Sequence, residues 1–265
     1  MMFASATLGA RNDAQNRTRS SWQTSVATTH PTAANGWTAI ALAITLFVSY
    51  AYFYQAGGWN QNSRFALVRA IVEQGTLRID DTVSVDGQLI TGDLTKHGDH
   101  TYSDKAPGLA LIAVPLVALS QLFVTEPQSP AGIASISYIA TLFSASLPTI
   151  FTALMILQLC SRLGATPSAA AFAALVFGLG SPAWCYSTLF YGHALTTACL
   201  TGAFAAALAL EDPSSSRRDW LLGATVGLCG GWATVTEYQT VVPAAMTASL
   251  ALWHAAKGGR ARALR

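Results

Sequence analysis

Apolar segments long enough to form membrane-spanning helices recur along this chain of 265 residues. A helix that crosses the hydrocarbon core of a bilayer needs about 20 mostly apolar residues. Six segments come close to this length or exceed it, and we predict a transmembrane helix in each: 37–54, 133–161, 167–186, 191–210, 220–236 and 239–256. The pattern therefore predicts an all-α, polytopic integral membrane protein with about six transmembrane helices.

One long polar interval, 55–107, interrupts this pattern. It holds seven of the 13 acidic residues, namely Glu73, Asp80, Asp81, Asp86, Asp93, Asp99 and Asp104. Apolar residues and two arginines alternate over 62–73, which predicts a juxtamembrane helix, and Gly75 is suited to end it. Asp86 and Gly87 lie between two short β-prone runs, so we predict a hairpin turn there.

A seventh apolar run, 108–124, is short and contains Pro115, which removes a helical hydrogen bond. Basic residues beside the spans mark the cytoplasmic side of a membrane protein. Four such basic groups flank the apolar segments: Arg11, Arg17 and Arg19; Arg162; Arg217 and Arg218; and Lys257, Arg260, Arg262 and Arg265. With six spans, an even number of crossings separates each group from the next, and all four lie inside. We therefore predict that 108–124 is an interfacial or re-entrant helix on the outer face. A full span is the alternative, because the charge rule is statistical.

This topology divides the chain into three regions. Residues 1–36 are rich in Ser, Thr and Ala and are predicted to form a disordered cytoplasmic tail. Residues 37–256 form the membrane domain, with an outer loop over 55–132 that includes the helix 108–124. Residues 257–265 form a basic cytoplasmic tail. We expect a multi-pass protein of the cell (inner) membrane with both termini in the cytoplasm. The outer loop and the junctions 187–193 and 236–238 then share the outer face, where their polar residues can converge.

Composition agrees with a membrane protein and excludes several kinds of site. The chain is 52% hydrophobic and 11% charged, against about 25% charged for soluble proteins. A net charge of +2 gives no indication of a nucleic-acid partner. The four cysteines lie in apolar segments without CxxC spacing, which predicts neither disulfides nor zinc. His97, Asp99, His100 and Asp104 have no defined metal-ligand spacing, so we expect no cofactor, with a divalent metal ion at these residues as the alternative.

Two motifs in the outer loop resemble those of a known enzyme family. The order NQNSRFALVRA, at 60–70, followed by SDKAPG, at 103–108, is similar to the first outer loop of GT-C glycosyltransferases that use lipid-linked donors. These include the protein O-mannosyltransferases and the aminoarabinose transferases. The order of the later apolar segments is similar too, so the resemblance covers about 37–256. It implies transfer of a sugar from a polyprenyl-phosphate donor on the outer membrane face, with membrane lipid as a second partner.

The resemblance assigns roles to individual positions. Asp104 and Lys105 match the Asp-Lys of the family, and Lys105 is expected to bind the donor phosphate. Arg64 matches the arginine of the loop. His193 stands where the family has an acidic residue at a helix start, and Glu237 stands where a lysine is common. The expected catalytic residues are thus Asp104, Glu237 and His193. The expected substrate-binding residues are Lys105, Arg64, Asn62, Gln61 and Tyr238.

One departure from the family concerns its acidic pair. Gln61 and Asn62 occupy that position, and a neutral amide cannot accept a proton from the acceptor. Asp80, Asp81, Asp104, Glu237 or His193 can replace the missing base. The rival hypothesis is a non-catalytic membrane protein that binds lipid or serves as an assembly subunit. A transporter is a third hypothesis, but the chain shows no paired inverted repeat of broken helices.

Overall fold

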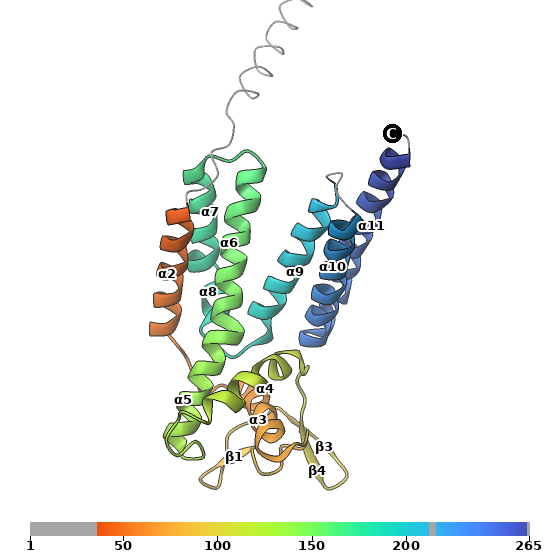
Figure 1. The fold of residues 1–265 in the computed structure, drawn as a ribbon. Coiled ribbons are helices and arrows are strands. Elements are labelled where there is room, and N and C mark those ends of the chain that lie inside the picture. Colours follow the sequence, from red (N-terminus) through yellow and green to blue (C-terminus); the bar gives the residue numbers. More distant parts are fainter. Residues whose placement is uncertain (1–35, 212–215, 264–265) are drawn as a thin grey trace, which may run out of the picture.

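The computed structural model describes residues 36–211 and 216–263, and this part of the chain is predominantly helical. Long helices run side by side, and a smaller unit of short helices and hairpins covers one end of them (Figure 1). The long helices are α2 (Gly36–Tyr52), α6 (Leu147–Arg162), α7 (Pro167–Gly180), α9 (Gly192–Ala209), α10 (Ser216–Thr236) and α11 (Val241–Ala263). The predicted tail 1–36 lies almost wholly outside the described residues, as does the end of the tail 257–265.

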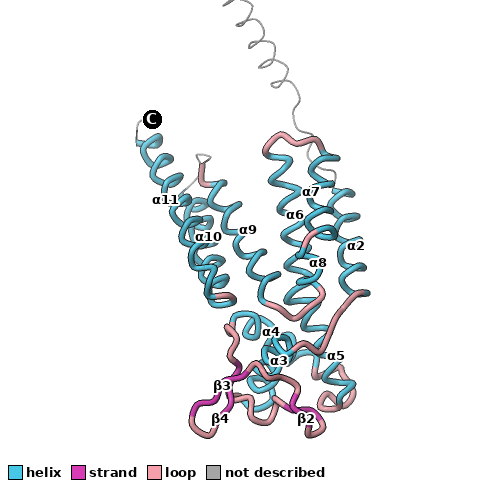
Figure 2. The backbone as a smooth tube through the Cα atoms, turned by 180° about the vertical axis from the view of Figure 1, so that it is seen from behind, coloured by secondary structure: helices cyan, strands magenta, loops and turns pink. Residues whose placement is uncertain are grey.

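The smaller unit is built from the polar interval and the segment that follows it. It contains α3 (Trp59–Gln74), α4 (Gly108–Ser120) and α5 (Pro130–Thr141), with two antiparallel hairpins. These are β1 (Ser84–Val85) with β2 (Gln88–Leu89), and β3 (Leu94–His97) with β4 (His100–Ser103). Both hairpins lie at the end of the molecule opposite the chain terminus marked C, apart from each other (Figure 2).

Three helices begin with the same two-residue signal. Ser129, Thr166 and Ser181 each cap a helix by accepting a hydrogen bond from a backbone N–H in its first turn, and a proline follows each. A hydroxyl at this position satisfies an unpaired N–H, and proline is tolerated next because its missing N–H has no helical partner there. At Ser181 the signal divides the predicted span 167–186 into α7 and the short α8 (Pro182–Ser187). That prediction of one continuous helix was therefore wrong.

A helix of 33 residues, Pro130–Arg162, joins the smaller unit to the bundle. It consists of α5, a π-helical turn η1 (Leu142–Ser146) and α6. Pro148 explains the wide turn, because proline cannot donate to the carbonyl of Ser144 and its ring would collide with that group. The helix continues because the wider turn accommodates the proline ring.

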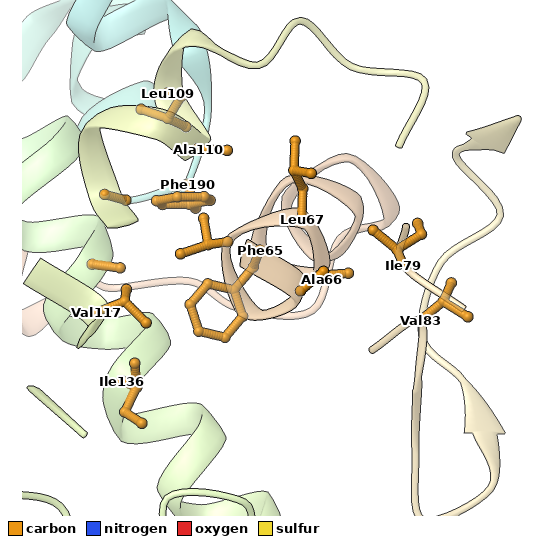
Figure 3. Packing of buried hydrophobic residues seen from close by; sticks show 14 of the residues in the cluster. Phe65, Ala66, Leu67, Ile79, Val83, Leu109, Ala110, Val117, Ile136 and Phe190 are labelled. Carbon is orange, nitrogen blue, oxygen red and sulfur yellow. The ribbon is translucent and has the colours of Figure 1, made fainter. Parts of the chain in front are cut away.

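Three clusters of buried apolar side chains hold these parts together. One lies between α2, α6 and α7 and contains Leu46, Tyr50 and Leu157. A second lies between α9, α10 and α11 around Ala207 and Val226. The third is the core of the smaller unit, where α3 contributes Phe65, Ala66, Leu67 and Val68 (Figure 3). Leu109 and Ala110 of α4, Ile136 of α5 and Phe190 complete it, so this core connects the polar unit to the bundle.

The local predictions for the polar interval are largely confirmed. Gly75 ends α3 in the left-handed conformation, and its N–H donates to the carbonyl of Ile71. Asp86 and Gly87 both have positive φ, 49° and 74°, as a tight hairpin turn requires. The predicted juxtamembrane helix is present as α3, but its burial differs from that of a helix lying on a surface. Nearly every residue from Gln61 to Ala70 is buried, because α4 and the hairpins enclose it.

The segment 108–124 forms α4, which ends at Ser120, and it lies at the end of the bundle next to α3 (Figure 1). Within the described residues, two helices are long and apolar enough to cross a membrane, Pro130–Arg162 and Gly192–Ala209. The helices α2, α4 and α7 are apolar but shorter. Two such helices support association with a membrane.

Candidate functional site

The centre of the candidate site is a buried ion pair between the smaller unit and the bundle. Arg64 of α3 donates from Nη2 to Oε1 of Glu237, which follows the last residue of α10, over 2.9 Å. The two residues are only 3% and 9% exposed. Nδ1 of His193, at the start of α9, lies 3.8 Å from the same Glu237 oxygen. The polar interval 55–107 and the junctions 187–193 and 236–238 therefore meet at one place.

This meeting requires two glycines. A Cβ atom on Gly192 would overlap with the Glu237 carboxylate, and one on Gly108 would overlap with the backbone of Thr236. The N-termini of α9 and α4 thus approach the end of α10 without any side chain between them. Phe65, next to Arg64 in the sequence, makes an edge-to-face contact with Phe190, and the two ring centroids are 6.0 Å apart.

Arg64 joins three segments through its guanidinium group. Besides Glu237, it donates from Nε to Oδ1 of Asn60 over 2.9 Å and from Nη1 to the carbonyl of Ala106 over 3.1 Å. Burial lowers the pKa of Arg64, and the neighbouring Glu237 opposes this shift by charge and by hydrogen bonding. Because the ordinary pKa of arginine is so high, the group stays protonated. Arg64 therefore fixes the 104–107 turn against α3 and α10.

Lys105 lies in that turn and is the more accessible cation. Its Nζ is 3.0 Å from Oδ2 of Asp93 and 3.2 Å from Oδ1 of Asp104, and its side chain is 20% exposed. Desolvation lowers the pKa of Lys105, but the two carboxylates outweigh this effect and the net pKa is raised. The amine is thus fully charged at neutral pH, and it is held in place by acids rather than by apolar packing.

Gln61 and Asn62, which were expected to bind substrate, have structural roles here. Gln61 is buried, and Nδ2 of Asn62 donates to the carbonyl of Ile90 over 2.7 Å. The next residue, Ser63, shares a 2.7 Å hydrogen bond with Ser103. These contacts tie α3 to the hairpins and to the start of the 104–107 turn.

Aromatic rings surround His193 on the bundle side of the site. Its ring centroid is 4.5 Å from that of Tyr186 in an edge-to-face contact, and it stacks with Tyr191 at 6.0 Å. His193 and Tyr186 also line a cavity of about 240 Å³ between α6, α7 and α9. Hydroxyl groups of Thr149, Thr152, Ser181 and Thr197 belong to the same cavity wall. His193 therefore lies both at this cavity and near Glu237.

The residues predicted from the sequence thus fall into two adjacent groups. Arg64 and Glu237 form a buried pair with the partly exposed His193 beside it, Asp104 and Lys105 form the other group, and the carbonyl of Ala106 links the two. Tyr238 is 64% exposed beside Glu237. Asp80 and Asp81 have other partners: Asp80 accepts from the N–H of Thr101 and pairs with His100, and Asp81 accepts from Gln74.

Sequence reasoning missed three residues of the site. Asp93 carried no signal beyond being one acid among several in the loop, and only the β3–β4 hairpin brings it to Lys105. Tyr186 and Tyr191 both precede the predicted His193 in the sequence YSTLFYGH, at 186–193, so the aromatic content of that stretch was the available signal. Their ring contacts with His193 depend on the turn between α8 and α9.

The two groups have different chemical capacities. Lys105 offers an accessible ammonium group for an anion such as phosphate, and Asp104, with a side chain 38% exposed, offers a carboxylate beside it that can accept a proton. The Glu237 carboxylate is already paired with the guanidinium group of Arg64. Across 36–211 and 216–263, no group of three or more His, Cys, Asp or Glu side chains is arranged to hold a metal ion. Comparison of the chain with protein-family models, with curated proteins and with solved structures finds no match.

Proposed function

We propose that this protein is a polytopic membrane protein whose bundle spans the bilayer. Large apolar side chains cover the outward faces of its helices. This holds also for helices that are too short, by length alone, to count as membrane spans. Examples are Ile44, Val48, Phe172, Val176, Leu228, Val242, Met246 and Leu252, all of them exposed. Apolar surface of this extent is unfavourable in water but favourable in contact with lipid.

The arrangement of charges supports one orientation. Arg162, Arg217 and Lys257 lie at or near the end of the bundle where α2 begins, and the acidic polar unit covers the other end (Figure 1). The proposed topology therefore has the basic end in the cytoplasm and the polar unit outside. This topology can be tested with two single-cysteine variants of a protein from which the four native cysteines have been removed. One variant carries its cysteine at position 123, after α4, and the other at position 217.

A membrane-impermeant thiol reagent applied to intact cells should label position 123 and should label position 217 only after permeabilisation. The reverse result would contradict the proposed topology, because it would place position 123 inside and position 217 outside.

We further propose that the outer site is that of a GT-C-like glycosyltransferase, or of the N-terminal part of one. It takes a sugar from a polyprenyl-phosphate donor. The observation that carries this proposal is the accessible Lys105–Asp104 pair, positioned beside the buried Arg64–Glu237 pair and the partly exposed His193, where the polar unit meets the bundle. The phosphate of a lipid-linked donor lies at the membrane surface, and the positive charge of Lys105 would bind it there.

In the proposed reaction, a hydroxyl or amine of the acceptor attacks the anomeric carbon of the donor sugar. The bond between that carbon and the phosphate oxygen breaks, and its electron pair leaves with the polyprenyl phosphate. Lys105 neutralises the added negative charge on the phosphate. Asp104 takes the proton of the acceptor. Arg64 holds the 104–107 turn in place through Ala106 and does not itself contact the donor.

The test is sugar transfer by the purified full-length chain in lipid nanodiscs, with a panel of polyprenyl-phosphate sugars. Lys105→Ala should abolish transfer. Lys96→Ala is the matched control, because Lys96 is an exposed lysine of the same loop on strand β3. The absence of transfer by the wild-type chain with every donor, or equal transfer by both variants, would sink the proposed enzyme.

A second candidate function is supported by Gln61 and Asn62. These residues replace the acidic pair and are used for structure, and Glu237 is neutralised by Arg64. Both facts favour a non-catalytic subunit that binds a lipid phosphate at Lys105. Such a protein would bind sugar-free polyprenyl phosphate with a loss of affinity in Lys105→Ala, and would turn over no donor.

A further inference from the structure

A second cavity lies in the bundle, away from the outer site. It has a volume of about 430 Å³ and lies between α6, α9 and α10. It begins near the middle of the bundle, at Phe151, Ala198 and Cys229, and extends to Arg162 and Ala209 at the ends of α6 and α9. In Figure 1, α6 and α9 diverge toward this basic end.

The lining of this groove changes from apolar to basic along its length. One face of α6 contributes the apolar residues Phe151, Met155 and Leu159. The same helix contributes the polar residues Gln158 and Arg162 near its C-terminal end. The walls on α9 and α10 are small or apolar, for example Gly202, Ala205 and Leu222. The groove therefore suits a ligand with an apolar chain and an anionic, hydrogen-bonding head.

Arg162 is the charge available for such a head group. It is exposed at the last residue of α6, and within the described part of the chain no ion pair joins it to an acidic side chain. A cation at the cytoplasmic membrane surface attracts the anionic lipids of that leaflet. An apolar groove left empty forfeits dispersion contacts along its walls, and lipid chains are the apolar molecules that surround it.

We propose that this groove binds one anionic phospholipid of the inner leaflet, with an acyl chain between α6, α9 and α10 and the phosphate on Arg162. The proposal rests on the membrane topology given above but is independent of sugar transfer. Gln158, one turn before Arg162, donates a hydrogen bond to the same head group. The lipid fills the space between α6 on one side and α9 and α10 on the other, so it stabilises their relative position.

The first measurement is native mass spectrometry of the detergent-purified chain titrated with phosphatidylglycerol or with phosphatidylcholine. We expect one phosphatidylglycerol to be retained and phosphatidylcholine to be lost. Arg162→Gln should weaken phosphatidylglycerol binding about five- to tenfold, the effect of one charge at a membrane surface. Arg217→Gln, an exposed arginine at the same end that does not line the groove, should leave binding unchanged.

A second variant tests the apolar part. A Cβ atom added at Gly202 would lie 3.8 Å from Phe151 and 4.0 Å from Cys229, which are ordinary contact distances, so the larger side chain in Gly202→Leu should fill the groove. It should abolish retention of the lipid while circular dichroism still shows a helical protein. If Gly202→Leu does not fold, the binding measurement with Arg162→Gln tests the proposal by itself, because that substitution changes only an exposed side chain.

Thiol protection gives an independent readout. Cys199 and Cys229 line the groove, whereas Cys185 is exposed on α8. Phosphatidylglycerol should slow alkylation of Cys199 and Cys229 by a lipid-soluble maleimide, with Cys185 unaffected, and Arg162→Gln should remove this protection. Equal losses in Arg162→Gln and Arg217→Gln, equal binding of the two phospholipids, or displacement by polyprenyl phosphate would overturn the proposal. None of these results depends on whether sugar is transferred.

Discussion

Arg64 and Glu237 form a buried ion pair across 173 residues of sequence, and the pair joins the polar unit to the bundle. A buried pair of this kind contributes little compared with apolar residues of the same shape, but the loss of one partner leaves an uncompensated charge. The consequence is mechanical as well as electrostatic, because the same guanidinium also holds the turn that carries Lys105.

Replacing one member of this pair should therefore destabilise the protein strongly. We expect Arg64→Gln or Glu237→Gln to lower the free energy of unfolding by about 3–5 kcal/mol, as for other broken buried pairs. The measurement is thermal unfolding in detergent, with the double variant completing a mutant cycle. Arg78→Gln, at an exposed arginine of the same loop, is the control. An equal effect at Arg64 and Arg78 would contradict the importance of the pair.

The close approach of α9 to the end of α10 gives a second prediction. Gly192→Ala adds a methyl group that overlaps with the Glu237 carboxylate, so we expect a loss of about 1–3 kcal/mol from overpacking. Gly227→Ala is the matched control, since nothing lies within 4 Å of a Cβ atom at that position on α10. It should be neutral or stabilising by up to about 1 kcal/mol, the difference in helix propensity. Similar unfolding temperatures for both variants would show that α9 can move away.

The β3–β4 hairpin should depend on pH through Asp80. The backbone N–H of Thr101 and the side chain of His100 bind this carboxylate and lower its pKa from the ordinary value. A lowered pKa in the folded state means that the stabilisation is complete above the unfolded pKa, near 4, and is lost as the pH falls through the folded value. Asp80→Asn should therefore flatten the dependence of the unfolding temperature on pH below about 4. Asp99→Asn, at the exposed hairpin turn, should retain the wild-type slope.

Asp93 gives a prediction about ligand binding rather than stability. Its carboxylate pairs with Lys105 and would repel a phosphate at the same place. Asp93→Asn should therefore strengthen the binding of polyprenyl phosphate several-fold, as measured by native mass spectrometry or calorimetry. Asp86→Asn, in the other hairpin, should have no effect. Weaker binding in Asp93→Asn would instead assign Asp93 the role of holding Lys105 in its working position.

Those features of the fold that depend on local sequence were predictable. Gly75 and the Asp86–Gly87 turn followed from conformational preferences, and the helices followed from the apolar segments. The meeting of Arg64, His193 and Glu237 was expected as well, because the predicted topology, with an even number of crossings, placed the distant junctions on one face. This convergence could be expected without knowing which atoms of the three residues are in contact.

The burial of Arg64 could not be predicted, because it depends on α4, on Glu237 and on two glycines far away in the chain. The β3–β4 hairpin was missed for a related reason. Its strands, LTKH and HTYS, lack a clear alternation of apolar and polar residues, and the contact of Asp93 with Lys105 depends on their pairing. The break at Ser181 was hidden in an apolar run whose proline could equally have produced a kink.

The π-helical turn at 142–146 also determines which way the long helix faces. One additional residue in a turn rotates every later side chain by about 100° relative to the earlier ones. Ile136 and Ala140 before the turn accordingly pack in the polar unit, whereas Ile150, Ala153 and Leu157 after it pack against α2 and α7. A single helix thus belongs to two cores that require different phases, and deleting one residue such as Ala145 would allow only one of the two cores to form.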